Sequence, residues 1–412
     1  MDFIIDIGGR PGYDCNGFCK FCYFKNIKKD SFVSFGCKYC LPFKKGCQYC
    51  TYGIKEYSSG FKPLKQVLSE IYIQLKSIEN EKNLDSFHIT GGGDISCYPY
   101  LLELVDFLSE LNYPIKIGYT SGKGFSIENI NSLLKYNISE INYSLFSSSY
   151  KLRKEYLNDN CPWTSLKKYN LLCDNCKVYT SILLIKGIND GDVLTNTLNF
   201  IESSKSRDVL LMRFSNFIEN GLILNNTPIL NGIKCHTPLE FKEIIYNESI
   251  KRPNLRISGT PIGDPKTNAP FAIIKDTSYL KKLPVIKKRA TIITGSIASF
   301  YLKKLFSIIG NNLVNVIGVK KEIACLITEN DLNDINLKYV QETVFVPGRC
   351  LIHESKLKSF FSSDGINRIV RRGPNMLTVD GEISISMSKE EVLNFEVSNL
   401  SSLIDSINTI GT

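Results

Sequence analysis

Three cysteines near the N-terminus have the residue type and spacing of a cluster site. Cys15, Cys19 and Cys22 stand in C-x3-C-x2-C order after the strand-like run at residues 3–7. Three thiolates on one short loop can each bind one iron of a [4Fe–4S] cluster, which leaves the fourth iron open for a ligand from outside the protein. An open iron indicates chemistry, whereas four protein ligands would indicate electron storage. The alternatives for these residues are a zinc site and buried thiols.

A second group of four cysteines lies within an insertion at residues 24–56. It consists of two C-x2-C pairs: Cys37, Cys40, Cys47 and Cys50. Two such pairs this close predict a tetrahedral four-thiolate site for one metal ion. Soft sulfur ligands suit zinc or a single iron, and the spacing does not choose between them. Because four protein ligands leave no open coordination position, the metal is expected to fold a loop that is too short to have its own core.

Length and composition exclude several classes of protein. At 412 residues the chain exceeds what one hydrophobic core usually serves, so two or three domains are expected. It has no apolar run as long as a membrane span and no N-terminal signal pattern, which predicts a cytoplasmic protein without a membrane partner. The 14 cysteines, clustered in metal-ligand spacings, favour a reducing compartment over a disulfide scaffold. The charge of +9 is not concentrated in a tail, so nucleic acid is not expected as a partner.

Strand-like and helical runs alternate over residues 1–217. Strands are expected at residues 3–7, 86–90, 115–119, 140–146, 178–185 and 209–214. Helices are expected at 63–78, 100–111 and 126–136, the first with apolar residues at helical spacing. Six βα units in order predict an α/β fold, a partial (β/α)6 barrel whose ligand site lies at the carboxyl ends of the strands. The cysteine loop follows the first strand and therefore falls at that end.

The pattern changes after residue 217. Residues 218–283 are rich in Asn, Pro and Gly, with one helix at 239–246, and are expected to be a connector. Residues 284–412 are expected to form a second domain of α+β type. Its strands are predicted at 290–294, 314–319, 323–328 and 376–379, and its helices at 296–308 and 389–407.

A glycine-rich turn ends the second expected strand. Gly91, Gly92 and Gly93 precede Asp94 there, and successive glycines let backbone donors and acceptors approach a small ligand closely. Three glycines alone are a weak signal. Their position at a strand end favours a ligand-binding turn over an ordinary one.

The cysteine loop and the glycine turn resemble those of the radical S-adenosylmethionine (SAM) superfamily, as do the aromatic residues Phe21 and Tyr23 beside Cys22. The resemblance implies that the open iron chelates SAM and that an electron splits the sulfonium to give a 5′-deoxyadenosyl radical. It also implies that the glycine turn holds the SAM amino group. In the superfamily an acidic residue directly follows two glycines, whereas Gly93 intervenes here, which leaves the role of Asp94 open.

Two further places match superfamily positions that contact the SAM nucleoside. Ser144 lies on the fourth expected strand, and residues 185–187 follow the fifth. The resemblance implies that these residues contact ribose and adenine.

A closer resemblance, over almost the whole chain, is to the methanogenesis marker protein 10 family. It rests on both cysteine groups and on three motifs, GYTSG at 118–122, KKEIACLIT at 320–328 and RIVRRGP at 368–374. The resemblance implies an archaeal enzyme of methanogenesis, a cobalamin-dependent radical SAM methyltransferase. Its substrate would be an arginine in the α subunit of methyl-coenzyme M reductase, converted to 5-C-methylarginine. An electron donor is the second partner implied.

The family resemblance also implies roles for three residues. Tyr23 would reach the open iron before SAM arrives, Tyr119 would lie close to the reacting centre, and Leu326 would pack beneath cobalt without supplying a ligand. The second domain has no D-x-H-x-x-G element, by which many cobalamin proteins supply a histidine. An ordinary core position remains the alternative for Leu326. For the whole chain, the alternative is a cobalamin-independent radical SAM enzyme that modifies a peptide or an RNA.

The four-cysteine loop gives a prediction that needs no other part of the chain. A variant in which Cys15, Cys19 and Cys22 are replaced by alanine should still bind about one metal ion per chain, because one tetrahedral site needs only four thiolates. Elemental analysis of the purified variant measures this. Finding no bound metal would reject the site.

Overall fold

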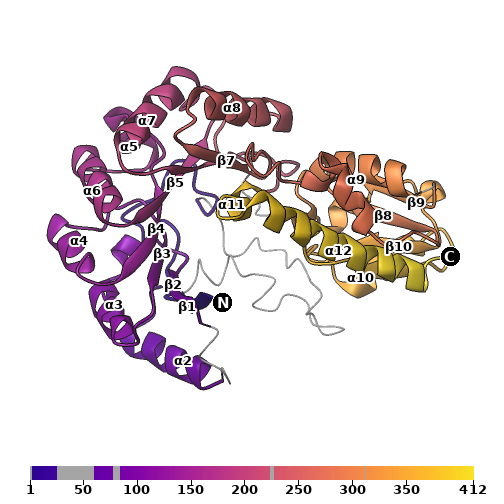
Figure 1. Cartoon of the computed structure of the whole chain (residues 1–412), viewed down its shortest axis with the longest axis horizontal. Coiled ribbons are helices and arrows are strands. Elements are labelled where there is room, and N and C mark those ends of the chain that lie inside the picture. The colour runs from indigo at the N-terminus through magenta and orange to yellow at the C-terminus, as the bar shows by residue number, and fades with distance from the viewer. Residues whose placement is uncertain (1, 26–59, 78–83, 223–226, 311) are drawn as a thin grey trace.

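The computed structural model describes residues 2–25, 60–77, 84–222, 227–310 and 312–412, so Cys37, Cys40, Cys47 and Cys50 lie outside the described residues. A first sheet of seven parallel strands runs in chain order from β1 to β7. The strands are β1 Asp2–Asp6, β2 Ser86–Thr90, β3 Ile115–Thr120, β4 Ile138–Ser144, β5 Lys177–Leu184, β6 Asp208–Arg213 and β7 Arg256–Thr260. In Figure 1 their helices lie along one side of the curved sheet, and a second body lies across from the other side.

Helices connect these strands because parallel neighbours need a crossover segment. They are α2 Leu64–Ser77, α3 Leu101–Ser109, α4 Ile127–Leu133, α5 Tyr150–Tyr156, α6 Pro162–Asn175, α7 Gly191–Ser203 and α8 Pro238–Lys251, with the 3-10 turn η3 Ile95–Cys97 after β2. Local sequence fixes several starts. In α8, Thr237 and Glu240 form a capping box and Pro238 occupies the first turn. Apolar residues of strands and helices form one core, which includes Ile89, Leu104 and Ile117.

The six predicted strands are confirmed, but the sheet has a seventh. Strand β7 and helix α8 lie within residues 218–283, so part of the segment expected to be a connector belongs to the sheet. The sequence of β7, Arg-Ile-Ser-Gly-Thr, has one large apolar residue and therefore no strand-like pattern. Gly259 lies close to α8, since a Cβ atom there would come 2.0 Å from the Cδ1 atom of Ile245 and would force that side chain to move.

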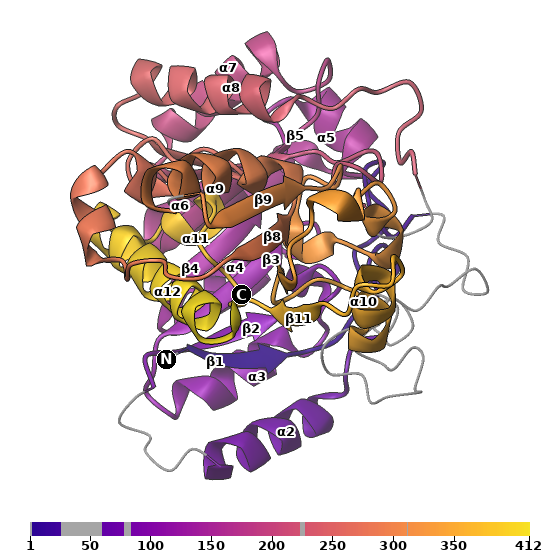
Figure 2. The same ribbon diagram turned by 90° about the vertical axis from the view of Figure 1, so that its right-hand side faces the viewer.

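The second body holds a four-stranded sheet in the order β11-β10-β8-β9, all parallel. Its strands are β8 Ala290–Thr294, β9 Val314–Gly318, β10 Thr343–Val346 and β11 Ile369–Arg372. Its helices are α9 Ser296–Ile309, α10 Glu354–Phe361, α11 Gly381–Ser384 and α12 Lys389–Ile410, with 3-10 turns η4 Ala272–Ile274, η5 Thr277–Lys282, η6 Ala324–Leu326, η7 Glu329–Leu332 and η8 Leu337–Tyr339. Figure 2 shows this body in front of the first sheet.

The expectation of an α+β domain is therefore wrong in its strand arrangement. Residues 323–328 hold the turn η6, and 376–379 form no strand, whereas β10 and β11 had no predicted counterpart. Both missed strands have only four residues, too few for a period to show. The first two predicted strands of this domain are confirmed as β8 and β9, and the two predicted helices as α9 and α12.

Charged and polar contacts join the two bodies. Arg213, at the end of β6, forms an ion pair with Glu322, and its Nε atom donates to the carbonyl of His236. Ser258 of β7 donates to the carbonyl of Gly381 at 2.8 Å. These contacts attach α11 and the segment before η6 to β6 and β7, the last two strands of the first sheet.

Asp264 is the most buried carboxylate at this junction. Arg256 donates to its two oxygens at 2.7 and 2.6 Å, and Thr267 and Ser384 donate their hydroxyl hydrogens. Burial alone would raise the pKa of Asp264, but these donors hold it below its ordinary value. Because Ser384 belongs to α11, the carboxylate helps to hold the second body on β7.

No helix in the described parts of the chain is both long enough and apolar enough to cross a membrane.

Replacing Asp264 with asparagine should lower the free energy of unfolding by roughly 3 kcal/mol at neutral pH, because Arg256 then loses its buried partner. The stabilisation from Asp264 is present above the ordinary pKa of 3.8 and is lost as the pH falls through the lowered pKa of the folded state. The difference in thermal midpoint between wild type and Asp264→Asn should therefore shrink in acid. Asp276→Asn, which alters an exposed pair with Lys389, is the control and should change the midpoint little. Equal midpoints for wild type and Asp264→Asn would contradict this role.

Candidate functional site

The loop that carries Cys15, Cys19 and Cys22 begins at the carboxyl end of β1, as predicted. Its backbone needs glycine at two places. Gly12 has φ +80°, and a Cβ there would come 2.2 Å from the ring of Phe18; Gly17 has φ +100°, and its Cβ would come 2.0 Å from the side chain of Asn158. The loop is thus folded tightly against itself and against the end of α5.

The glycine turn packs directly against this loop. The amide of Gly92 donates to the carbonyl of Gly8 at 2.9 Å, and a Cβ at Gly91 would come 2.6 Å from the same carbonyl. A Cβ at Gly93 would come 2.9 Å from the carbonyl of Asp14. Two of the glycines are therefore needed for close packing of backbone against backbone, and this packing puts the turn beside the cysteines.

Asp94 has a structural role that the sequence left open. One carboxylate oxygen accepts hydrogen bonds from the Ser96 amide and hydroxyl and from the Thr120 hydroxyl, and the other accepts from the Ser121 amide and hydroxyl. Its own amide lies 3.2 Å from the Sγ atom of Cys15. The buried carboxylate thus joins the end of β2 to the end of β3, directly behind the cysteine loop.

Burial sets the protonation of the three thiols. It raises the pKa of Cys15 to about 11, that of Cys19 to about 12, and that of Cys22 in the same direction. The ammonium group of Lys123 opposes this rise at all three thiols. Buried thiols of this kind ionise when a metal binds them, because the metal supplies the missing positive charge.

Lys123 also has a structural contact at the cysteine loop, and sequence reasoning missed it. Its Nζ atom donates to the carbonyl of Leu157 at 2.8 Å, and it lies 3.4 Å from the carbonyl of Gly17. The Sγ atom of Cys19 lies 3.7 Å from the same Leu157 carbonyl. Lys123 therefore brings a positive charge close to the thiols and holds the loop to the end of α5.

Aromatic side chains cover the other side of the loop. Phe21 stacks on Phe146 with ring centroids 5.0 Å apart, and Tyr23 stacks on Phe214 at 6.4 Å. The amide of Ser215 approaches the hydroxyl of Tyr23 at 3.4 Å, and burial raises the pKa of this phenol. Tyr23 therefore reaches from the cysteine loop to the carboxyl end of β6.

The other predicted residues of the first body also lie at strand ends. Ser144 is the last residue of β4 and pairs with Ser181 of β5. Tyr119 lies near the end of β3, and its hydroxyl donates to Glu382 of α11 at 2.6 Å. Burial raises the pKa of Tyr119 and that of Glu382. No sequence motif had indicated Glu382, because it comes from a four-residue helix in the second body.

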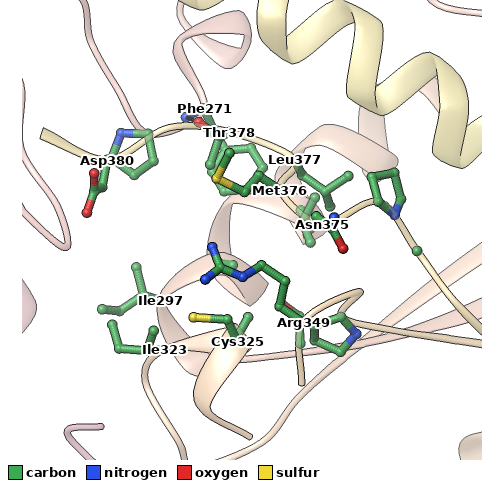
Figure 3. A pocket seen from close by; sticks show the side chains of 18 of the residues that line it. Phe271, Ile297, Ile323, Cys325, Arg349, Asn375, Met376, Leu377, Thr378 and Asp380 are labelled. Atoms are coloured by element: carbon green, nitrogen blue, oxygen red, sulfur yellow. Dashed lines mark hydrogen bonds between the residues drawn. The ribbon is translucent and has the colours of Figure 1, made fainter. Parts of the chain in front are cut away.

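A cavity of about 470 Å³ lies at the carboxyl edge of the second sheet, and it is larger than a cavity of about 160 Å³ beside Tyr246 and Lys275. The strand order reverses between β8 and β10, and the loops after these strands therefore diverge. Open parallel sheets bind ligands at such a reversal. The lining of the cavity includes Thr294, Cys325, Phe345, Arg349, Met376 and Glu382. Figure 3 shows several of the lining side chains around the opening.

Leu326 lies beside this cavity rather than in its lining. It is the last residue of η6, and Ile323, Ala324 and Cys325 before it do line the cavity. A Cβ at Gly221 would come 3.3 Å from the Cδ1 atom of Leu326. Leu326 thus lies half buried where the second body meets the segment that follows β6.

Within the described parts of the chain, no three histidine, cysteine, aspartate or glutamate side chains form a group that could hold a metal ion. A four-iron cluster makes a different geometric demand, since each thiolate binds its own iron.

Comparisons with known proteins give only distant matches. No family model and no curated protein matches the chain. Among solved structures, SuiB from Streptococcus suis is 16% identical over 63% of this chain and 49% of that chain, with a TM-score of 0.43. A radical SAM methyltransferase from Sphaerobacter thermophilus is 14% identical (62% and 66% covered, TM-score 0.38), and methylornithine synthase is 16% identical (62% and 63%, TM-score 0.40). The chain spans about half the length of SuiB, and similarities at this level assign no activity.

The packing of the glycine turn gives a prediction about the cysteine loop. Gly91→Ala should lower the iron and sulfide bound after anaerobic reconstitution, because the added methyl group would push the loop away at the Gly8 carbonyl. Gly60→Ala is the matched control, since its nearest neighbour is the flexible Arg10 side chain at 3.7 Å, and it should bind iron as wild type does. Undiminished iron in soluble Gly91→Ala protein would show that the loop does not depend on this contact.

Proposed function

We propose that this protein is a radical SAM enzyme, and more specifically a cobalamin-dependent C-methyltransferase. Its proposed substrate is an arginine in the α subunit of methyl-coenzyme M reductase, methylated at Cδ. The observation that carries the proposal is that three features meet at one edge of the first sheet. The cysteine loop, the glycine turn and Tyr119 all lie at the carboxyl ends of its strands. Tyr119 in turn contacts the lining of the cavity in the second body.

The residues at the first edge fit a [4Fe–4S] cluster and SAM. Cys15, Cys19 and Cys22 offer three thiolates, and the glycine turn beside them is at least partly exposed, so that a small ligand can reach its backbone. When bound, the cluster and SAM would supply a carbon radical able to remove hydrogen from an unactivated carbon. The chain's own part is to hold the thiolates, to place Lys123 against their charge, and to exclude water with Phe21 and Phe146.

A methyl donor other than SAM alone is needed for the proposed product. An sp3 carbon beside a guanidinium is neither acidic nor nucleophilic, so direct polar transfer from SAM has no accessible route. Cobalamin, when bound, would supply a methyl group that a carbon radical can accept. The cavity of the second body suits its apolar face, and because cobalamin is larger than 470 Å³, part of it would lie in the opening toward the first body. Among the residues that the structure describes, no histidine lines the cavity, and Leu326 beside it has no donor atom for cobalt.

Acidic groups at the mouth of the cavity suit a cationic substrate. Asp380 and Glu382 line it from the start of α11, and Glu382 already accepts a hydrogen bond from Tyr119. A guanidinium pairs well with carboxylates because it has several coplanar donors. Tyr119 and Glu382 would therefore position an arginine side chain between the carboxyl edges of the two sheets. An electron donor is the second proposed partner, and it would have to reach the cluster from outside.

The test is an anaerobic assay with reconstituted protein, SAM, a reductant, cobalamin and an arginine-containing peptide of the reductase. Wild type should form 5′-deoxyadenosine and add one methyl group to the arginine, detected by mass spectrometry. The triple variant Cys15→Ala, Cys19→Ala, Cys22→Ala should do neither, whereas Cys173→Ala with Cys176→Ala, at the end of α6, should retain both activities.

Each failure has a distinct meaning. SAM cleavage by the triple variant would sink the radical SAM assignment. Modification of the peptide without added or bound cobalamin would favour the cobalamin-independent alternative. Cleavage of SAM with no methylated arginine would reject the proposed substrate.

A further inference from the structure

Arg349 is the only cationic side chain in the described lining of the large cavity. It follows β10, and its guanidinium makes no hydrogen bond or ion pair with any residue that the structure describes. Figure 3 shows this guanidinium extending into the opening between Cys325 and Met376. Most of the remaining lining is apolar, so the positive charge projects into a space with few polar groups of its own.

None of the three carboxylates of the same lining forms an ion pair with Arg349 in the part of the chain that the structure describes. Glu322 pairs with Arg213, Glu382 accepts from Tyr119, and Asp380 accepts from the Thr260 hydroxyl and caps α11. Arg349 is exposed to solvent, so its guanidinium is free to form charged hydrogen bonds to a ligand that brings a negative charge.

The usual anion site at such a strand reversal is partly taken up by hydrogen bonds within the protein. In many α/β proteins a phosphate binds the free amides at the start of the helix after the first strand. Here that helix is α9, and the amides of Ser296 and Ile297 donate to the carbonyls of Lys321 and Glu322. Arg349 is the charged group of this lining that suits an anion.

The tightly packed loop after β10 places Arg349 at the cavity. Gly348 packs so tightly that a Cβ would come 2.5 Å from the carbonyl of Gly373 and 2.6 Å from that of Pro374. The loop after β10 is thereby held against the loop after β11, and the next residue, Arg349, projects into the space between them. Burial raises the pKa of Cys325 in the same lining, and the charge of Arg349 opposes that rise.

We propose that Arg349 binds the anionic group of the ligand in this cavity and that this group is the phosphodiester of cobalamin. This identification rests on the proposed function. The corrin ring bears neutral amide side chains, so the phosphodiester in the nucleotide tail is the part of cobalamin that a guanidinium can recognise through two parallel hydrogen bonds. Arg349 would thus select cobalamin over a corrinoid that lacks the tail.

The experiment compares binding of cobalamin and of cobinamide, which lacks the phosphate, ribose and base. Dissociation constants are measured by absorbance titration for full-length wild type, Arg349→Gln and Arg349→Lys. Arg349→Gln should weaken cobalamin binding roughly tenfold or more, the loss expected for a charged hydrogen bond, and should leave cobinamide binding unchanged. Arg349→Lys should lose less, because it keeps the charge. Arg371→Gln, on the neighbouring strand and outside the lining, is the matched control and should bind both as wild type does.

The outcomes separate this inference from the proposed function. If Arg349→Gln weakens both ligands equally, or weakens neither, the contact with the phosphodiester is overturned while cobalamin binding stands. If wild type binds neither corrinoid, both the inference and the cobalamin part of the proposed function are overturned.

Discussion

The carboxyl edge of the first sheet depends on the hydrogen bonds that the buried carboxylate of Asp94 accepts. Its hydrogen bonds to residues 96, 120 and 121 fix the ends of β2 and β3 relative to each other, and its amide meets the Sγ atom of Cys15. Without that carboxylate, several buried hydroxyl and amide donors would lose their acceptor, at a cost of about 1 to 3 kcal/mol for each unsatisfied group. The cysteine loop, the glycine turn and Tyr119 all take their positions from this small network.

The second constraint is the junction between the two bodies, which brings the carboxyl edges of their sheets toward each other. Parallel strands put all their carboxyl ends on one edge, and both sheets of this chain are parallel. Arg213 with Glu322 joins the bodies at the carboxyl end of β6, and Asp264 with Arg256 and Ser384 joins them at the amino end of β7. Under the proposed function, a radical formed at one edge would be used only if its target were held nearby and water were kept out, which is what two facing edges would provide.

The sequence alone predicted the elements with strong local patterns. All six expected strands of the first sheet exist, because long apolar strands and amphipathic helices show in their periodicity. The sequence did not predict β7, because this strand has Gly259 and polar residues where apolar ones would show a pattern. It did not predict β10 and β11 because four residues are too few to show a period. The spacing of Cys15, Cys19 and Cys22 indicated the candidate site, since these proposed ligands lie close together in the sequence of one loop. Glu382 and Arg349 could not be found in this way, because they reach the site only through tertiary packing of the second body.

The most direct test of the account is electron paramagnetic resonance of the reduced, anaerobically reconstituted protein, before and after addition of SAM. A cluster held by Cys15, Cys19 and Cys22 has one iron without a protein ligand, so SAM should change the spectrum of the reduced cluster by binding that iron. The account predicts such a change in wild type and no cluster signal in the triple alanine variant. A cluster signal that SAM leaves unchanged would contradict an open iron, and with it the central claim.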